Sequence, residues 1–369
     1  MTKTKLFFDG TPLIGRYVSG VGKVLQETLR ALDTKERASM YDMFIFIPVE
    51  ERGKVDKFGY KYIKIKYLPY PHKFLSLFSR MRFSPPIDIF LGKGVYIFEN
   101  FRNWNLALSK SITYVHDVAF RVHPEFVEER NLTYLNNNID MWINRTDVVV
   151  TVSESSKVDI RNELGVEPEV VPNGVWSDQF SPRTETETES VRTKWSIPGK
   201  YYLFIGNIEP RKNLENTIEA FSKVARNDES LVLIGGGGWR NEAILAKAQE
   251  TTDAGNPVVR PSGYIPDEDL PALISGAKAL VHFPWYEGSG LPILQAIACG
   301  APVASSDIAP LREVVDGFED RVVFADPKNI DAMVVAIAKA SKKIHRQRGK
   351  RPASWTRSAN KLIEIIESL

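Results

Sequence analysis

Runs of β-branched and aromatic residues alternate with helical patterns along the chain, and this alternation restricts the fold more than any other feature. Strands and helices that alternate in this way form parallel sheets covered by helices on both faces. We therefore predict an α/β chain with two doubly wound parallel sheets of the Rossmann type. The predicted strands are residues 6–9, 43–48, 62–68, 95–99, 112–116 and 148–153 in the first half, and residues 202–206, 231–235, 279–284, 302–305 and 322–324 in the second.

The length of 369 residues favours two domains, each large enough to bury its own core. Residues 182–190 are acidic and apolar-free, so we expect a linker there. Trp355, Leu362 and Ile366 belong to an apolar stripe at helical spacing, which has to pack against another part of the chain. The expected organisation is a first domain over residues 1–182, a linker over 183–199, a second domain over 200–345 and a C-terminal helical segment over 346–369.

The charges nearly balance, with 48 Lys and Arg against 46 Asp and Glu, so no basic field indicates a nucleic-acid partner. A single cysteine, Cys299, excludes an internal disulfide and a metal site with several thiolate ligands, which fits a reducing compartment. No run of about 18 apolar residues is present, so no membrane span is expected. We therefore expect a cytoplasmic protein that binds any anionic ligand at a local site.

Arg211 and Lys212 lie between a predicted strand and a predicted helix, within the segment 206–213. The N-terminus of a helix offers unpaired N–H groups and a positive dipole end, and adjacent cations add charge to it. This combination predicts a phosphate site on an exposed loop. The alternative is that two basic residues after a proline form a solvated turn.

Glu287 precedes a glycine-containing turn, at the end of another predicted strand and before a further helix. Small residues at such a turn allow backbone amides to approach an anion closely. Glu287 could fix a sugar hydroxyl or a neighbouring cation, or it could cap the helix that follows. The residues alone leave these interpretations open.

In the first half, Gly20 and Gly22 stand between a predicted strand and a helical pattern and could form a third phosphate-approach loop. The full G-x-G-x-x-G fingerprint is missing, so a nicotinamide enzyme is not expected. His116 ends a strand at the edge where α/β sheets bind ligands. The other histidines lack metal-ligand spacing, so we expect no metal site and interpret His116 as a hydrogen-bond donor.

Taken in order, these segments resemble the retaining nucleotide-sugar glycosyltransferases of family 4, which have the GT-B fold of two Rossmann-like domains facing across a cleft. The resemblance covers nearly the whole chain, and each motif is weak by itself while their order is specific. The segments that carry it are residues 152–156, 171–175, 204–214, 263–270 and 286–292.

The resemblance implies an N-terminal acceptor domain, a C-terminal nucleotide-sugar domain and a last helix that crosses back onto the first domain. It implies three catalytic residues, His116, Lys212 and Glu287. Since the cations and amides would neutralise the departing diphosphate, we expect no metal and no cofactor beyond the nucleotide-sugar substrate. The residues implied in donor binding are Gly20, Gly22, Asn173, Asn207, Arg211, Lys212, Tyr264, Ile265, Gly288, Ser289, Gly290, Leu291 and Gln295.

Gln295 departs from the family pattern, because such enzymes commonly have a second glutamate eight positions after the first, used on the ribose hydroxyls. The glutamine carbonyl can still accept a hydrogen bond, but the bond is no longer charge-assisted. Whether Gln295 replaces that glutamate in function is left open by the sequence.

The segment 209–213, with the later glycines and Trp239, looks most like the mannosyltransferase end of the family. We therefore expect a hexosyltransferase that moves mannose from GDP-mannose onto a glycan or lipid-linked glycan, in the biosynthesis of a surface polysaccharide such as lipopolysaccharide. UDP-sugars remain open as donors. The alternatives are a nucleotide-sugar epimerase on the same scaffold and a non-catalytic nucleotide-sugar-binding subunit.

Basic and aromatic residues are interleaved between residues 54 and 85. Within this region, we interpret the alternation over residues 63–67 as the two sides of an edge strand. For residues 71–85, peripheral contact with the inner face of the cytoplasmic membrane and an ordinary surface are both open.

Overall fold

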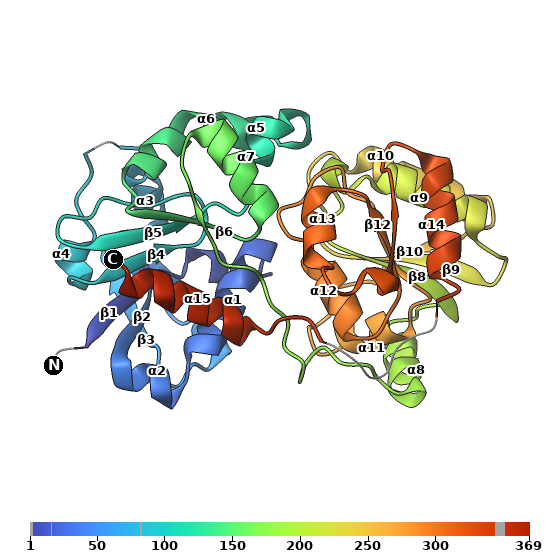
Figure 1. Cartoon of the computed structure of the whole chain (residues 1–369), viewed down its shortest axis with the longest axis horizontal. Helices are drawn as coiled ribbons and strands as arrows, with labels where there is room; N and C mark the ends of the chain where they lie inside the picture. Colours follow the sequence, from blue (N-terminus) through green and yellow to red (C-terminus); the bar gives the residue numbers. More distant parts are fainter. Residues whose placement is uncertain (1–2, 16, 82, 344–350) are drawn as a thin grey trace. The chain divides into compact units, whose positions relative to one another are not determined.

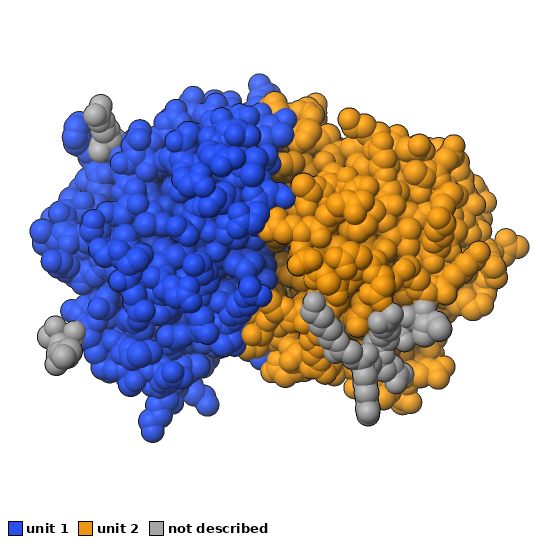
Figure 2. All heavy atoms as spheres, in the orientation of Figure 1, with its two compact units in different colours: residues 1–122, 129–173, 355–369 blue, residues 123–128, 174–354 orange. Residues whose placement is uncertain are grey.

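The computed structural model describes residues 3–15, 17–81, 83–343 and 351–369. The chain forms two compact units, coloured separately in Figure 2. Unit 1 comprises Met1–Val122, Glu129–Asn173 and Trp355–Leu369, and unit 2 comprises His123–Glu128 and Gly174–Ser354. Unit 2 therefore begins within the region that we assigned to the first domain, and residues 346–350 of the expected C-terminal segment lie outside the described residues.

Unit 1 is built on a parallel sheet with the strand order β3-β2-β1-β4-β5-β6-β7. All six strands predicted in the first half are confirmed, and Leu6 pairs with Met43 on one side and with Val95 on the other. The additional strand β7 has only two residues, which is too short for a detectable pattern. The strands are β1 Thr4–Asp9, β2 Tyr41–Pro48, β3 Lys64–Leu68, β4 Val95–Phe98, β5 Lys110–Tyr114, β6 Val148–Thr151 and β7 Glu169–Val170.

Helices cover both faces of this sheet, as the sequence predicts (Figure 1). Under one face, Leu25 and Leu29 of α1 share a core with Leu362 and Ile363 of α15, so the structure places the C-terminal helix in unit 1. The helices are α1 Gly20–Leu32, α2 Lys35–Met40, α3 His72–Phe78, α4 Asp88–Leu91, α5 Ala119–Val122, α6 Glu129–Asn144, α7 Glu154–Leu164 and α15 Trp355–Glu367, with short 3-10 helices at Thr11–Leu13, Val49–Glu51 and Asp56–Phe58.

Strand β3 is one of the two edge strands of the unit 1 sheet, so the edge position is confirmed, whereas the alternation of buried and exposed residues is confirmed only in part. Ile63 is buried and Lys64 is exposed. Lys66 is not simply in solvent, because its ammonium nitrogen lies 4.7 Å from the centre of the Phe44 ring.

Unit 2 has a second parallel sheet, with the order β10-β9-β8-β11-β12-β13. The five strands predicted in the second half are confirmed, and the two-residue strand β10 is again additional. The strands are β8 Lys200–Ile205, β9 Glu229–Ile234, β10 Val258–Val259, β11 Leu280–His282, β12 Val303–Ser306 and β13 Val322–Ala325. The helices are α8 Glu185–Lys194, α9 Leu214–Val224, α10 Glu242–Asp253, α11 Leu270–Gly276, α12 Leu291–Ala298, α13 Ala309–Val314 and α14 Ile330–Ala340, with 3-10 helices at Pro124–Phe126, Pro210–Lys212 and Glu319–Arg321.

The segment that we expected as a linker is largely helix α8, and it belongs to unit 2. Thr184 starts this helix with a capping box, in which its hydroxyl accepts from the Glu187 N–H and the Glu187 carboxylate accepts from the Thr184 N–H. After the helix, the Trp195 indole donates to Asp269 at 2.8 Å, which ties the segment to the body of the unit. The expectation relied on the polar composition and overlooked the Thr-x-x-Glu signal that begins a helix.

Both sheets have a topological switch point, which is the place between two neighbouring central strands where the strand order reverses. In unit 1 it lies between β1 and β4, and in unit 2 it lies between β8 and β11. Open α/β sheets bind their ligands outside the carboxyl ends of the strands at such points. None of the helices in the described ranges has the length and apolar character needed to cross a lipid bilayer.

Candidate functional site

The carboxyl end of β8, at the switch point of unit 2, carries both predicted phosphate-binding cations. Arg211 and Lys212 lie in the 3-10 helix Pro210–Lys212, which Asn213 joins to α9 with a left-handed φ of 53°. The Asn213 side chain donates to the carbonyl of Pro327 at 3.0 Å, which fixes the turn. Lys212 is only 8% exposed, so our expectation of an exposed loop cation is wrong.

Gly235 allows the loops after β8 and β9 to approach each other. A Cβ atom at this position would lie 1.9 Å from the carbonyl oxygen of Gly206, and the φ of Gly235 is +153°. A larger residue would therefore move the backbone of the segment that leads to Arg211 and Lys212.

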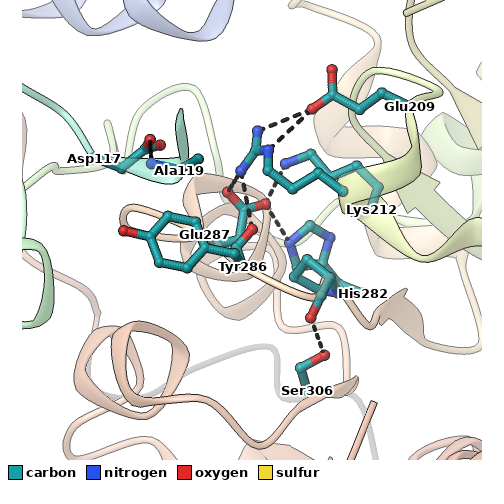
Figure 3. A network of polar contacts seen from close by, with 10 residues as sticks. Asp117, Ala119, Glu209, Lys212, His282, Tyr286, Glu287 and Ser306 are labelled. Carbon is teal, nitrogen blue, oxygen red and sulfur yellow. Dashed lines mark hydrogen bonds and ion pairs between the residues drawn. The ribbon is translucent and has the colours of Figure 1, made fainter. Parts of the chain in front are cut away.

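Glu287 is the centre of a buried network of charges, which Figure 3 shows from close by. One carboxylate oxygen, Oε1, accepts from Lys212 Nζ and, at 3.2 Å, from His282 Nε2. The other, Oε2, accepts from Arg211 Nη1 at 3.1 Å. Arg211 also donates through Nε and Nη2 to Glu209 Oε1, at 3.2 and 3.1 Å. We call these five residues, Glu209, Arg211, Lys212, His282 and Glu287, the charge cluster.

The structure decides between the interpretations that the sequence left open for Glu287. Helix α12 has Gly290 as its N-cap and no capping side chain, so the capping interpretation is wrong. The contacts with Lys212 and Arg211 are those of a carboxylate that holds neighbouring cations. At its position, Gly290 has a φ of +77°, and a Cβ atom there would lie 2.5 Å from a methyl carbon of Leu311.

Burial alone would raise the pKa of Glu287, but the charges of Lys212 and Arg211 outweigh it and hold that pKa well below its usual range. On Lys212, burial and Arg211 lower the pKa, whereas Glu287 opposes them. We infer an ion pair, because the ionised carboxylate lies in direct contact with the ammonium group. The two cations and the two glutamates of the charge cluster sum to zero, and Glu287 holds both cations beside each other.

The sequence analysis assigned no role to His282 or Glu209, and it considered His282 only as a possible metal ligand. His282 is fully buried at the end of β11, where it stacks on Phe204 at 6.0 Å between ring centres. Since Glu287 is ionised and can only accept, His282 Nε2 donates to it. Within the described ranges, no group bonds to the buried Nδ1 atom of His282. A histidine that ends a central strand five residues before a candidate glutamate would have been a usable signal.

The remaining predicted donor-binding residues of unit 2 lie outside the charge cluster. Gly288 and Ser289 precede Gly290, and Leu291 is the first residue of α12. Gln295 is half-buried one turn further along the helix. Tyr264 is 48% exposed, its neighbour Ile265 is buried, and Asn207 is exposed on the turn after β8.

In unit 1, the two predicted glycines have different surroundings. Gly20 is the first residue of α1, and a Cβ atom there would meet open space. At Gly22, a Cβ atom would lie 2.5 Å from the carbonyl oxygen of Pro12. The Gly22 amide already donates to the Ser19 hydroxyl at 3.2 Å, so this glycine serves the packing of α1 and its amide is occupied by the cap.

His116 follows β5, close to the switch point of unit 1, and its Nε2 atom lies 2.9 Å from the backbone carbonyl of Glu99. A carbonyl only accepts, so Nε2 is the donor and Nδ1 is left as an acceptor in the neutral ring. Burial lowers the pKa of His116, which favours this neutral form. Asn173 ends the stretch Glu129–Asn173 of unit 1 and is buried.

In the parts of the chain that the structure covers, no three His, Cys, Asp or Glu side chains come together in a way that could hold a metal ion. The chemistry that the charge cluster itself offers is the binding of an anion by two cations, one of which is buried.

Comparisons with known proteins bear on the family and the fold. Residues 186–361 match the family model described as glycosyl transferases group 1. The O-antigen chain mannosyltransferase B of Escherichia coli is 32% identical over 232 residues, which cover 61% of this chain and 60% of that protein. The serotype-specific mannosyltransferase WbdA of Escherichia coli is 26% identical over 219 residues, which cover 57% of this chain and 27% of WbdA. The match thus spans less than two thirds of either relative.

Among solved structures, Anabaena Alr3699/HepE in complex with UDP and glucose aligns over 100% of both chains with a TM-score of 0.68 and 14% identity. A likeness at this identity establishes the fold. Each unit has the parallel α/β sheet expected of the GT-B fold. Residues 186–361 therefore resemble the group 1 glycosyl transferases, in a chain that has the GT-B fold.

Proposed function

We propose that this protein is a retaining glycosyltransferase that transfers mannose from GDP-mannose to a glycan or lipid-linked glycan acceptor, in the biosynthesis of a surface polysaccharide. The observation that carries the proposal is the pairing of Arg211 and Lys212 with one buried glutamate at the switch point of unit 2. The group 1 match supports the reaction class, and the two Escherichia coli relatives named mannosyltransferases support mannose.

The proposed roles follow from charge. Breaking the bond between sugar and diphosphate leaves negative charge on the nucleotide, which Lys212, Arg211 and the amides at the start of α12 would stabilise more strongly in the transition state than in the ground state. Glu287 would keep both cations in place and present its remaining lone pairs to a sugar hydroxyl. His116 would accept a hydroxyl of the donor sugar through Nδ1. No metal ion is needed in this scheme.

The donor is tested first by binding. GDP-mannose, GDP, UDP-glucose and ADP-glucose are compared in a thermal-shift series, since a ligand of the native state raises the melting temperature. We expect the largest shift with GDP-mannose, and a larger shift with UDP-glucose would contradict the nucleotide assignment. The purified protein is then incubated with the donor, with and without a panel of mannose-ended glycans and lipid-linked glycans.

We expect GDP release that depends on the acceptor and persists in EDTA. Conversion of the donor without any acceptor would instead indicate an epimerase. Binding without turnover on any acceptor would indicate a non-catalytic subunit. Loss of turnover in EDTA, restored by a divalent cation, would contradict metal independence.

We also propose that unit 1 contacts the inner face of the cytoplasmic membrane through α3 and the segment after it. Phe74, Leu77 and Phe83 are 44%, 51% and 82% exposed there. Two hydrogen bonds fix the backbone of this segment. The indole N–H groups of Trp104 and Trp142 donate to the carbonyls of Leu75 and Ser79, at 2.8 and 2.6 Å. Exposed apolar side chains on a fixed backbone, with nearby cations such as Lys73, suit an anionic lipid surface.

Membrane contact is measured by sedimentation with vesicles of phosphatidylglycerol and phosphatidylethanolamine. We expect the wild type to bind and the double variant Leu77→Ser, Phe83→Ser to lose most of this binding. As a matched control, Val335→Ser replaces an exposed apolar residue of α14 in unit 2 and should bind as the wild type does. Equal binding of both variants would contradict this docking surface.

A further inference from the structure

A second group of titratable side chains lies at the switch point of unit 1, and the sequence analysis assigned it no role. Asp9 is the last residue of β1 and Glu99 directly follows β4, so they stand on the two strands that flank the switch point. Both are buried, with 1% and 0% of their surface exposed. We call Asp9 and Glu99 the carboxyl pair.

The two members of the carboxyl pair have different surroundings. Asp9 accepts hydrogen bonds from the Thr11 N–H at 2.9 Å and from the Thr11 hydroxyl at 3.0 Å. Neither carboxyl oxygen of Glu99 has a hydrogen-bond partner in the described part of the chain, and the same is true of the neighbouring Tyr114 hydroxyl. An ionised carboxylate in such a place would lose its water and gain no donor in return. The negative charge of the pair therefore resides on Asp9, and Glu99 retains its proton.

Electrostatics point in the same direction. Burial raises the pKa of Glu99 to about 8, and the charge of Asp9 raises it further in the same sense. Burial and Glu99 likewise raise the pKa of Tyr114, so this phenol stays neutral. The other charged group beside His116 is Asp117, whose carboxylate accepts from the Ala119 N–H at 3.0 Å.

Glu99 contacts His116 in two ways. Its backbone carbonyl accepts from His116 Nε2 at 2.9 Å, and its side-chain oxygen Oε2 lies 3.7 Å from the same nitrogen. While the carboxyl group is neutral, it adds no charge that would favour the imidazolium ion. If it were ionised, it would favour that ion, whose Nδ1 atom would become a donor instead of an acceptor.

We propose that Glu99 is a positioning residue, which carries a proton at neutral pH and thereby keeps His116 in the neutral tautomer with Nδ1 as an acceptor for a sugar hydroxyl. The claim that His116 accepts a sugar hydroxyl rests on the proposed function. The claim that Glu99 carries a proton involves unit 1 alone and is tested without any substrate.

The test uses the full chain with ¹³C-labelled histidine, and His116 is assigned by the loss of its signal in H116Q. The pKa of His116 is measured by NMR in the wild type, in Glu99→Gln and in the matched control Asp117→Asn. Glu99→Gln should leave this pKa within about 0.3 units, because it replaces a neutral group, whereas Asp117→Asn should lower it, because it removes a negative charge. A fall of a unit or more in Glu99→Gln would show that Glu99 is ionised and would overturn the proposal.

Two further measurements keep the proposal testable if Glu99→Gln fails to fold. In the wild type, infrared difference spectra should show a protonated carboxyl group at pH 7 that disappears above pH 8, and its absence at pH 7 would overturn the proposal. If Glu99→Gln does fold, the fall of transferase activity at alkaline pH should move to higher pH. If the alkaline fall of activity does not move while the pKa of His116 is unchanged, the link between Glu99 and the sugar hydroxyl is rejected. The proposed function is then tested separately, by donor binding in the thermal-shift series.

Discussion

The two units share one topology at their switch points and fill them with opposite chemistry. In unit 2, the strands β8 and β11 lead to two cations and two carboxylates whose charges cancel. In unit 1, the strands β1 and β4 lead to Asp9 and Glu99, and the side chain of Glu99 lies beside His116. The first arrangement offers two cations to an anion, and the second can hold a proton and present a neutral acceptor.

If the proposed function holds, the two units have separate tasks. A departing diphosphate is a multiply charged anion, so it requires cations. A sugar hydroxyl is neutral and needs a positioned acceptor, which an imidazolium ion would not offer. The following changes test this division, from the largest expected effect to the smallest.

Lys212→Ala should have the largest effect, because it removes one of the two cations at the unit 2 switch point. It removes a cation that would act on the departing diphosphate, so turnover should fall by roughly 10²- to 10³-fold. It also leaves Glu287 buried with fewer partners, so the free energy of unfolding should fall by about 3–5 kcal/mol, measured by urea denaturation. Lys200→Ala removes an exposed lysine that is paired with Asp228, and it should change neither quantity. Wild-type turnover in Lys212→Ala would remove the basis for the proposed mechanism.

Glu99→Gln should flatten the pH dependence of stability between about pH 5 and pH 8. The pKa of Glu99 is raised from 4.5 to about 8, so the folded state holds a proton that the unfolded state has released. The wild type should therefore be most stable below pH 4.5 with respect to this group, and lose roughly 1.4 kcal/mol per pH unit up to about pH 8. Urea denaturation between pH 5 and pH 9 measures the slope. Identical slopes in the wild type and the variant would contradict a neutral Glu99.

His282→Phe should weaken the charge cluster by removing a donor from Glu287. A hydrogen bond to a charged group contributes about 1.5–3 kcal/mol, so turnover should fall by about tenfold or more. His282→Gln can still place a donor near Glu287, and we expect it to recover part of the loss. Steady-state kinetics compares the wild type, His282→Gln and His282→Phe, and we expect turnover to fall in that order. Equal turnover in the two variants would show that His282 serves packing alone.

Gln295→Glu should have the smallest effect. If residue 295 contacts the ribose, a carboxylate would make the bond charge-assisted and tighten nucleotide binding by about fivefold, or about 1 kcal/mol. Isothermal titration calorimetry with GDP measures the change. Unchanged or weaker binding would place the ribose elsewhere.

The sequence predicted the strands of both sheets well, because buried parallel strands read as apolar runs bounded by turns. It also identified Arg211, Lys212 and Glu287, which stand in ordered motifs. It could not show that these three side chains share one contact network, since residues 211 and 287 meet only through the pairing of β8 with β11. Glu99 was invisible for a similar reason, because burial and the neighbouring Asp9 depend on which strands lie side by side.

Both units are discontinuous in sequence, and the helix α15 lies in the last stretch of unit 1, Trp355–Leu369, which follows the stretch Gly174–Ser354 of unit 2 in the chain. During synthesis, the α1 face of unit 1 has to wait for residues 355–369 to cover Leu25 and Leu29, while the sheet of unit 2 is already complete. Deleting those residues would expose an apolar stripe on unit 1 and leave the unit 2 core intact. A ribosome-bound chain that lacks this helix should therefore contain a protease-resistant second unit beside a first unit that is still open to cleavage.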